Sequence, residues 1–315
     1  MSYNAKNKLG FGLYHLQPRW CRFADFKKIL DKNIFNSYIL GCGYGTSRDA
    51  AKMIAEQGGQ IWLGPDGPYC SCRDSLSDYM DKLRGFVEKL KEDGTFEQVV
   101  GFHWDEPISK PDHTNEDFLA MTRALYEEYG LRNYPVFSSQ ELIGAKGNMD
   151  DPDSDRMLQP FACEFITDIG YDSYGYDFRK PAGEGLEGRF ATLREEGFDG
   201  VCSTEDYYRF FIKRMQQLMG EKEARIWLYP CTYHCGRWGG GETDEDYCIA
   251  HLEGMAKLLL EQKNPGGLHC YTYKSWRLNG RGLDYYLSDQ NPQRWNRLET
   301  CLEKVSAQLR DIDIR

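Results

Sequence analysis

Short apolar runs alternate with longer amphipathic segments along the whole chain. The apolar runs, rich in β-branched and aromatic residues, predict β-strands at 9–16, 37–44, 60–65, 98–104, 134–139, 164–171, 225–231 and 267–273. The segments between them predict helices, clearest at 22–32, 48–58, 74–92, 116–129, 205–219, 244–262 and 292–310. The chain is therefore expected to repeat a strand–helix unit eight times.

The helical period and the residues at the helix starts support this assignment. In 76–90, apolar side chains recur every three or four residues, at Leu76, Tyr79, Met80, Leu83, Phe86, Val87 and Leu90. A Ser or Thr followed three residues later by Asp stands near four predicted helix starts, namely Thr46/Asp49, Ser71/Asp74, Ser203/Asp206 and Thr243/Asp246. Each pair resembles a capping box, in which the two residues satisfy backbone N–H groups of the first turn.

Eight strand–helix units predict one closed (β/α)8 barrel, the TIM barrel, spanning 1–315 as a single domain. Parallel strands joined by helices could also form an open doubly wound sheet. That fold usually has a GxGxxG phosphate loop, whereas Gly41-Cys42-Gly43-Tyr44-Gly45 has GxGxG spacing and a bulky tyrosine. We therefore favour the barrel. The stretch 140–163, where a helix should stand, has the composition of a loop.

The formal net charge of −10 comes from 39 basic and 49 acidic residues spread along the chain. Such a surface repels phosphate backbones and anionic lipid, so we expect no nucleic-acid or membrane partner. No apolar run is long enough to span a bilayer, and the N-terminus lacks the apolar region of a secretory signal. We expect a cytoplasmic protein, unless a leader has been removed. The oligomeric state is not predicted.

Cysteine is frequent, with 11 residues, and an odd number in a large unsecreted chain favours reduced thiols that serve packing. Cys70-Ser71-Cys72 and Cys231-Thr232-Tyr233-His234-Cys235 lack the two-residue spacer of structural zinc sites. We expect no metal and no organic cofactor.

In a (β/α)8 barrel, the active site forms where the C-terminal strand ends and the following loops meet. The polar and aromatic residues there are His15, Gln17, Tyr44, Asp66, His103, Asp105, Glu106, Gln140, Glu141, Asp172, Tyr174, Tyr176, Thr232, Tyr233, His234, Tyr273, Lys274 and Trp276. Carboxylates, histidines and aromatic rings dominate this set, and lysine is nearly absent. Aromatic faces stack on sugar rings while acids and amides bind their hydroxyls, so the set predicts a carbohydrate substrate.

The most informative run is 99–107, in which an apolar strand ends in Asp105, Glu106 and Pro107. Acids are seldom buried without a partner, and proline ends the strand, so the pair is expected at the barrel mouth. Two adjacent carboxylates cannot both ionise cheaply, so one keeps its proton near neutral pH. If Trp104 lines the pocket, its apolar face favours that protonated form. One carboxylic acid and one carboxylate are the states that glycoside cleavage requires. The competing structural interpretation is an acid pair that caps the next helix or binds an arginine.

The pair resembles the adjacent Asp-Glu on the fourth strand of (β/α)8 β-N-acetylhexosaminidases and β-N-acetylgalactosaminidases. That resemblance implies that Glu106 is the general acid and that Asp105 orients the substrate's 2-acetamido group, whose carbonyl attacks the anomeric carbon. Other retaining glycosidases on this barrel also place an acid/base Glu before proline on strand four, usually after Asn, and a second Glu at the end of strand seven. Here 225–233 contains no acid, which favours the substrate-assisted mechanism.

The run 168–177, which contains Tyr171, Asp172 and Tyr174, is similar to the tyrosine-bearing strand of substrate-assisted chitinases. We therefore expect Glu106, Asp105, Asp172 and Tyr174 to be catalytic. The expected substrate-binding residues are Asp66, His103, Trp104, Tyr171, Tyr233, His234, Tyr273 and Trp276.

Three alternatives remain open. A two-carboxylate glycosidase would use Asp172 or Glu141 as its second acid. A catalytically silent barrel would bind a glycan through its aromatic residues. A metal-dependent sugar isomerase or lyase would need several His and acid ligands to converge.

Overall fold

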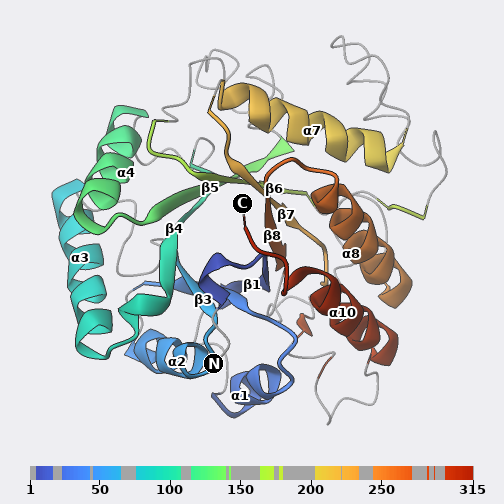
Figure 1. Ribbon diagram of the computed structural model, residues 1–315, viewed down its shortest axis with the longest axis horizontal. Helices are drawn as coiled ribbons and strands as arrows, with labels where there is room; N and C mark the ends of the chain where they lie inside the picture. The colour runs from blue at the N-terminus through green and yellow to red at the C-terminus, as the bar shows by residue number, and fades with distance from the viewer. Residues whose placement is uncertain are drawn as a thin grey trace.

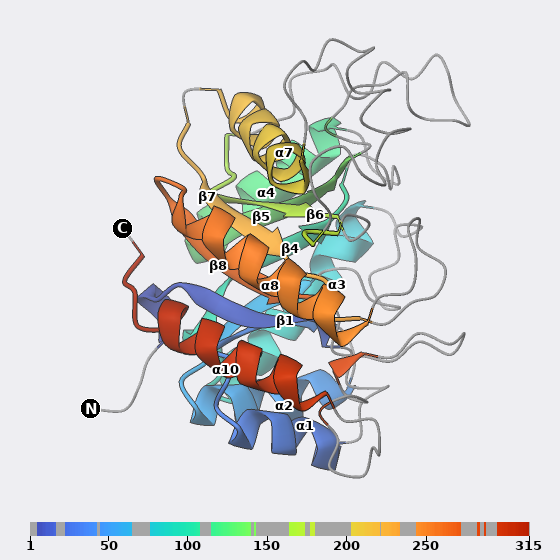
Figure 2. The ribbon, with the colours of Figure 1, turned by 90° about the vertical axis from the view of Figure 1, so that its right-hand side faces the viewer.

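A computed structural model shows a closed barrel of parallel strands surrounded by helices (Figures 1 and 2). The structure describes residues 5–16, 23–42, 45–64, 76–107, 115–139, 142, 164–173, 177–179, 203–220, 222–233, 244–271, 282–283, 287 and 295–314. The strands follow one another around the barrel in chain order, from β1 to β8. The predicted (β/α)8 barrel is therefore confirmed.

The strands lie where the apolar runs predict them. They are β1 (Gly10–Leu16), β2 (Ser37–Gly41), β3 (Gln60–Gly64), β4 (Val99–Asp105), β5 (Arg132–Ser138), β6 (Asp168–Asp172), β7 (Arg225–Tyr229) and β8 (Pro265–Cys270). Pairing of β1 with β8, from Gly10↔Gly267 to Leu13↔Cys270, closes the barrel. Because all neighbours are parallel, every C-terminal strand end lies at the same rim of the barrel.

Helices cover the outside of the barrel in both views (Figures 1 and 2). Those described are α1 (Phe23–Asp31), α2 (Gly45–Glu56), α3 (Leu76–Glu92), α4 (Asn115–Tyr129), α7 (Thr204–Leu218), α8 (Glu245–Leu260) and α10 (Asn296–Leu309). Each overlaps a predicted helix. The segment 140–163, expected to be a loop, lies almost entirely outside the described residues. None of the described helices is both long and apolar enough to span a bilayer.

Two packed layers form because alternate strand residues face opposite sides. On β7, Ile226 and Leu228 belong to the outer core under the helices, whereas Trp227 and Tyr229 belong to the cluster inside the barrel. A strand buried on both faces has no polar side, which is why the sequence shows apolar runs instead of alternation.

Large rings fill the barrel interior, and glycines make room for them. The rings of Trp62 and Trp227 lie 5.2 Å apart, and Tyr134 is 5.0 Å from each. A Cβ at Gly10 would lie 2.4 Å from the Trp227 ring, and one at Gly170 would lie 2.8 Å from Tyr134. The lower interior is therefore a packed core and leaves the rim as the place for chemistry.

The predicted N-terminal cap is correct for α7 and displaced by one residue for α8. Ser203 caps α7, with its hydroxyl accepting from the Asp206 N–H at 3.1 Å, as predicted. At α8 the cap is Asp244, which accepts from the Tyr247 N–H, so the prediction of Thr243 is wrong by one residue. Both residues suit this position, and local sequence alone does not distinguish adjacent candidates.

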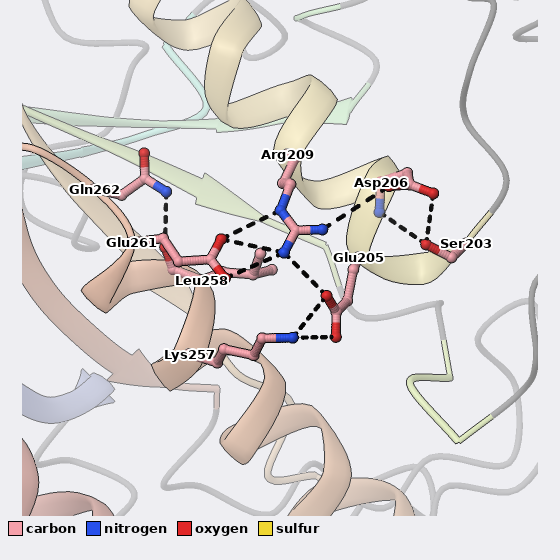
Figure 3. A network of polar contacts seen from close by, with 8 residues as sticks. All are labelled: Ser203, Glu205, Asp206, Arg209, Lys257, Leu258, Glu261 and Gln262. Atoms are coloured by element: carbon pink, nitrogen blue, oxygen red, sulfur yellow. Dashed lines mark hydrogen bonds and ion pairs between the residues drawn. The ribbon is translucent and has the colours of Figure 1, made fainter.

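Charged side chains connect α7 to α8 on the outer surface (Figure 3). Arg209 contacts Glu205 one turn earlier at 3.0 Å and reaches Glu261, at the end of α8, at 3.2 Å. Lys257 bonds the same Glu205 carboxylate at 2.9 Å. Exposed pairs of this kind contribute at most about 1 kcal/mol each, so the apolar face of each helix provides most of its attachment.

Candidate active site

Two carboxylates lie at the C-terminal ends of β4 and β6, which are separated by β5, and both face the barrel interior. Asp105 is the last residue of β4 and pairs in register with Val136, a member of the inner cluster. Asp172 is the last residue of β6 and pairs with Tyr229, also of the inner cluster. Residues in register share a face of a parallel sheet, so both carboxylates face inward. Each is half-buried.

Tyr14 of β1 joins this group from across the barrel. Its hydroxyl donates to Asp105 Oδ1 at 2.5 Å. The Tyr14 ring lies 5.4 Å from His103, 5.3 Å from Tyr229 and 5.6 Å from Tyr271, measured between centroids. Tyr14 is not among the site residues expected from the sequence, although it shares a strand face with Gly10 and Gly12. Two small residues before a large one on one face are typical of a barrel interior.

A chain of hydrogen bonds continues beneath the carboxylates. The Tyr134 hydroxyl donates to the Tyr229 oxygen at 2.7 Å, and Tyr229 Oη lies 3.0 Å from His103 Nε2. His269 Nε2 lies 2.9 Å from the Ser37 hydroxyl, and burial keeps the pKa of His269 well below its ordinary value. The site therefore rests on a polar, hydrogen-bonded layer that holds the imidazole of His103 in place.

The charges of Asp105 and Asp172 influence the same two tyrosine hydroxyls, those of Tyr14 and Tyr271. Burial raises the pKa of Tyr14, and the charges of Asp105 and Asp172 raise it further. Burial likewise raises the pKa of Tyr271, with contributions from the same two carboxylates. Asp172 is in register with Tyr229, whose ring contacts that of Tyr14, and Tyr14 is bonded to Asp105, so the two carboxylates lie around one group of tyrosines. They form one site.

Glu106, the residue after the end of β4, has an unusual backbone conformation. Its φ is +46°, in the left-handed region that few non-glycine residues adopt, and Pro107 follows it. Its N–H donates to the Val136 carbonyl at 2.9 Å, which keeps the residue attached to β5. Such a conformation costs about 1–2 kcal/mol and is concentrated at functional positions. The half-buried Glu106 therefore sits at a strained turn directly beside Asp105.

Two expected substrate-binding residues face away from this site. Trp104 packs in the outer core between Tyr79 and Phe118, and its indole N–H donates to Asn133. Tyr171 stacks on Phe211 of α7 with centroids 5.0 Å apart. Each is one residue from an inward aspartate, so strand alternation directs it to the helices. Both side chains, expected to bind substrate, therefore lie under the helices and not in the barrel interior.

The remaining expected residues divide into two groups. His103 lies inside the barrel beneath Asp105, and the buried Tyr233 ring lies 6.0 Å from that of Tyr271. Outside the described residues are Asp66, Glu141, Tyr174, His234, Tyr273 and Trp276. Besides Tyr14, the structure adds Tyr229 and Tyr271 to the site. Alternation along β7 and β8 is the signal that could have identified them, because it places Tyr229 and Tyr271 on the inward face with Trp227 and His269.

His251 of α8 supports the rim from outside the barrel. Its Nδ1 accepts from the Cys231 N–H at 3.0 Å, and its Nε2 lies 2.9 Å from the Tyr208 hydroxyl. Burial lowers the pKa of His251 to about 3. The imidazole is therefore neutral across the physiological range and holds the chain just after β7.

We expect acid to destabilise the fold through this histidine. Below about pH 6.5 the unfolded state takes up a proton that the folded state refuses until about pH 3, so the free energy of unfolding falls as the pH is lowered between these values. Urea titrations across pH 7 to 4 should show a shallower decline for His251→Gln, by up to about 1.4 kcal/mol per pH unit. An unchanged pH dependence would contradict the neutral, buried state.

Known structures share this fold. A Ruminococcus gnavus β-glucuronidase in complex with D-glucuronic acid superposes with a TM-score of 0.55 at 12% identity, covering 95% of this chain and 49% of that one. A Rhizomucor miehei β-1,3-glucanosyltransferase active-site mutant in complex with laminaritriose has a TM-score of 0.54 at 11% identity, covering 88% and 89%. The chain thus spans about half the length of the glucuronidase. No protein-family model and no curated protein sequence matches the chain. At these identities, the likeness establishes the fold class.

Proposed function

We propose that this protein is a glycoside hydrolase acting at the rim of the barrel. The observation that carries the proposal is the inward position of Asp105 and Asp172 beside one group of tyrosines, with Glu106 at a strained turn next to Asp105. Acids and aromatic rings together suit a sugar. The two structures of similar fold, a β-glucuronidase and a β-1,3-glucanosyltransferase, are bound to D-glucuronic acid and laminaritriose, which supports a carbohydrate substrate.

In the proposed mechanism Glu106 donates a proton to the leaving oxygen. Asp105 orients a 2-acetamido group, whose carbonyl oxygen attacks the anomeric carbon, so the enzyme supplies no nucleophile. The supporting observation is that no acid occurs between Arg225 and Tyr233, which includes all of β7 and the residues after it. We further propose that the sugar is contacted by Tyr233 and by five residues outside the described part of the chain, Asp66, Tyr174, His234, Tyr273 and Trp276.

A second mechanism uses Asp172 as the other reacting carboxylate. It is favoured by the inward position of Asp172 and by its effect on the same tyrosines as Asp105. In this mechanism Asp172 attacks the anomeric carbon or activates water, and the 2-acetamido group is unnecessary. The stereochemistry of the product and the dependence on the acetamido group distinguish the two mechanisms.

The test is hydrolysis of a panel of nitrophenyl glycosides that includes the N-acetylglucosaminide, the N-acetylgalactosaminide and the glucuronide. Substrate assistance predicts turnover of N-acetylated sugars with retention, seen by ¹H NMR of the first product, and slower turnover as the acetamido methyl is fluorinated. Activity that does not change when the acetamido methyl is fluorinated, and that is lost in Asp172→Asn, would instead favour the two-carboxylate mechanism. Glycan binding without turnover of any substrate would contradict the hydrolase and favour a binding protein.

A further inference from the structure

Tyr14 and Asp105 meet across the barrel, although their strands are not neighbours. β1 pairs with β2 and β8, and β4 pairs with β3 and β5, so the hydrogen bond between the two side chains crosses the interior. Such a bond is not needed to build either strand pair. It brings a fully buried phenol to one oxygen of a carboxylate at the rim.

The chemistry of the pair fixes the direction of the bond. Tyr14 keeps its proton, because burial and the neighbouring carboxylates raise its pKa well above the ordinary value. It is therefore the donor, and Asp105 Oδ1 is the acceptor. A hydrogen bond donated to a carboxylate stabilises the ionised form of that carboxylate over the protonated form.

Aromatic neighbours hold the donor in position. The Tyr14 ring meets Tyr229 edge-on at 87° and lies tilted against Tyr271 and His103. Tyr229 is itself bonded to Tyr134 and His103. The phenol has little freedom to leave Asp105, so the bond also restricts the orientation of the carboxylate.

We propose that Tyr14 is the positioning residue of Asp105: it keeps this carboxylate ionised and in one orientation for the substrate. This inference rests on the proposed glycosidase function. Ionised Asp105 can only accept hydrogen bonds, so the substrate group that it orients must be a donor, such as the N–H of an acetamido group. Tyr14 itself acts through Asp105.

The kinetic test is Tyr14→Phe, which removes the hydroxyl and keeps the ring. We expect kcat/KM to fall at least about tenfold, and its acid limb to move up by about one pH unit, because Asp105 then protonates more easily. In an Asp105→Asn background the same change should cause little further loss. The matched control is Tyr38→Phe, which deletes a buried hydroxyl that donates to the Phe35 carbonyl at 3.0 Å in the outer core, away from Asp105.

A second measurement does not depend on activity. The ¹³C signal of the Asp105 carboxyl should titrate at a higher pH in Tyr14→Phe than in the wild type. If Tyr14→Phe does not fold, 3,5-difluorotyrosine at position 14, a stronger donor of similar shape, should move the titration to lower pH. An Asp105 titration unaffected by either change would overturn the inference. Absence of all hydrolysis by the wild type would instead overturn the proposed function, and the titration would still decide the role of Tyr14.

Discussion

Glu106→Gln is expected to lower turnover of unactivated glycosides by about 10²–10⁴-fold, the usual contribution of a general acid. Glutamine keeps the size and polarity of the side chain but has no carboxylic proton to give to the leaving oxygen. We expect the backbone turn at φ +46° to be unchanged, because the substitution alters only the end of the side chain. Thermal unfolding of the variant should therefore remain close to that of the wild type.

The dependence on the leaving group makes this prediction specific. A dinitrophenolate leaves without protonation, so the variant should retain much of its activity on dinitrophenyl glycosides while losing it on alkyl glycosides. The matched control is Glu116→Gln, the same substitution at an exposed position in the first turn of α4. Equal rates for Glu106→Gln and the wild type on alkyl glycosides would exclude Glu106 as the acid.

Gly12→Ala is expected to prevent the barrel from closing normally. A Cβ at this position would lie 1.8 Å from the Ser37 carbonyl oxygen and 2.9 Å from His269 Cδ2. The first clash is with backbone of the paired strand, so no change of rotamer relieves it. We expect a loss of at least about 4 kcal/mol of unfolding free energy, or insoluble protein.

Gly85→Ala provides the matched comparison for that substitution. Gly85 is exposed on α3, and a Cβ there would have nothing within 4 Å. Because alanine favours the helix more than glycine does, this variant should gain about 1 kcal/mol. Urea unfolding followed by circular dichroism measures both variants. A Gly12→Ala protein as stable as the wild type would show that the strands separate there without cost.

Local patterns predict most of the fold because each element buries its apolar residues in a way that its own period reveals. The α3 helix, predicted at 74–92, begins at Leu76 and ends at Glu92. The strand predicted at 225–231 ends two residues earlier, at Tyr229. Element ends are less predictable, because the last strand hydrogen bonds and caps such as Asp244 depend on neighbours distant in sequence.

The sequence by itself determined the alternation of strands and helices, and with it the barrel and the rim where Asp105, Glu106 and Asp172 lie. Only the tertiary structure decided which residues beside them face inward. A strand buried on both sides carries apolar residues on each face, so composition does not distinguish Trp104, which packs under the helices, from Tyr14, which meets Asp105 inside. Closure of the barrel decides which face of each strand points inward, and it brings Tyr14 of β1 and Asp105 of β4 together across one interior.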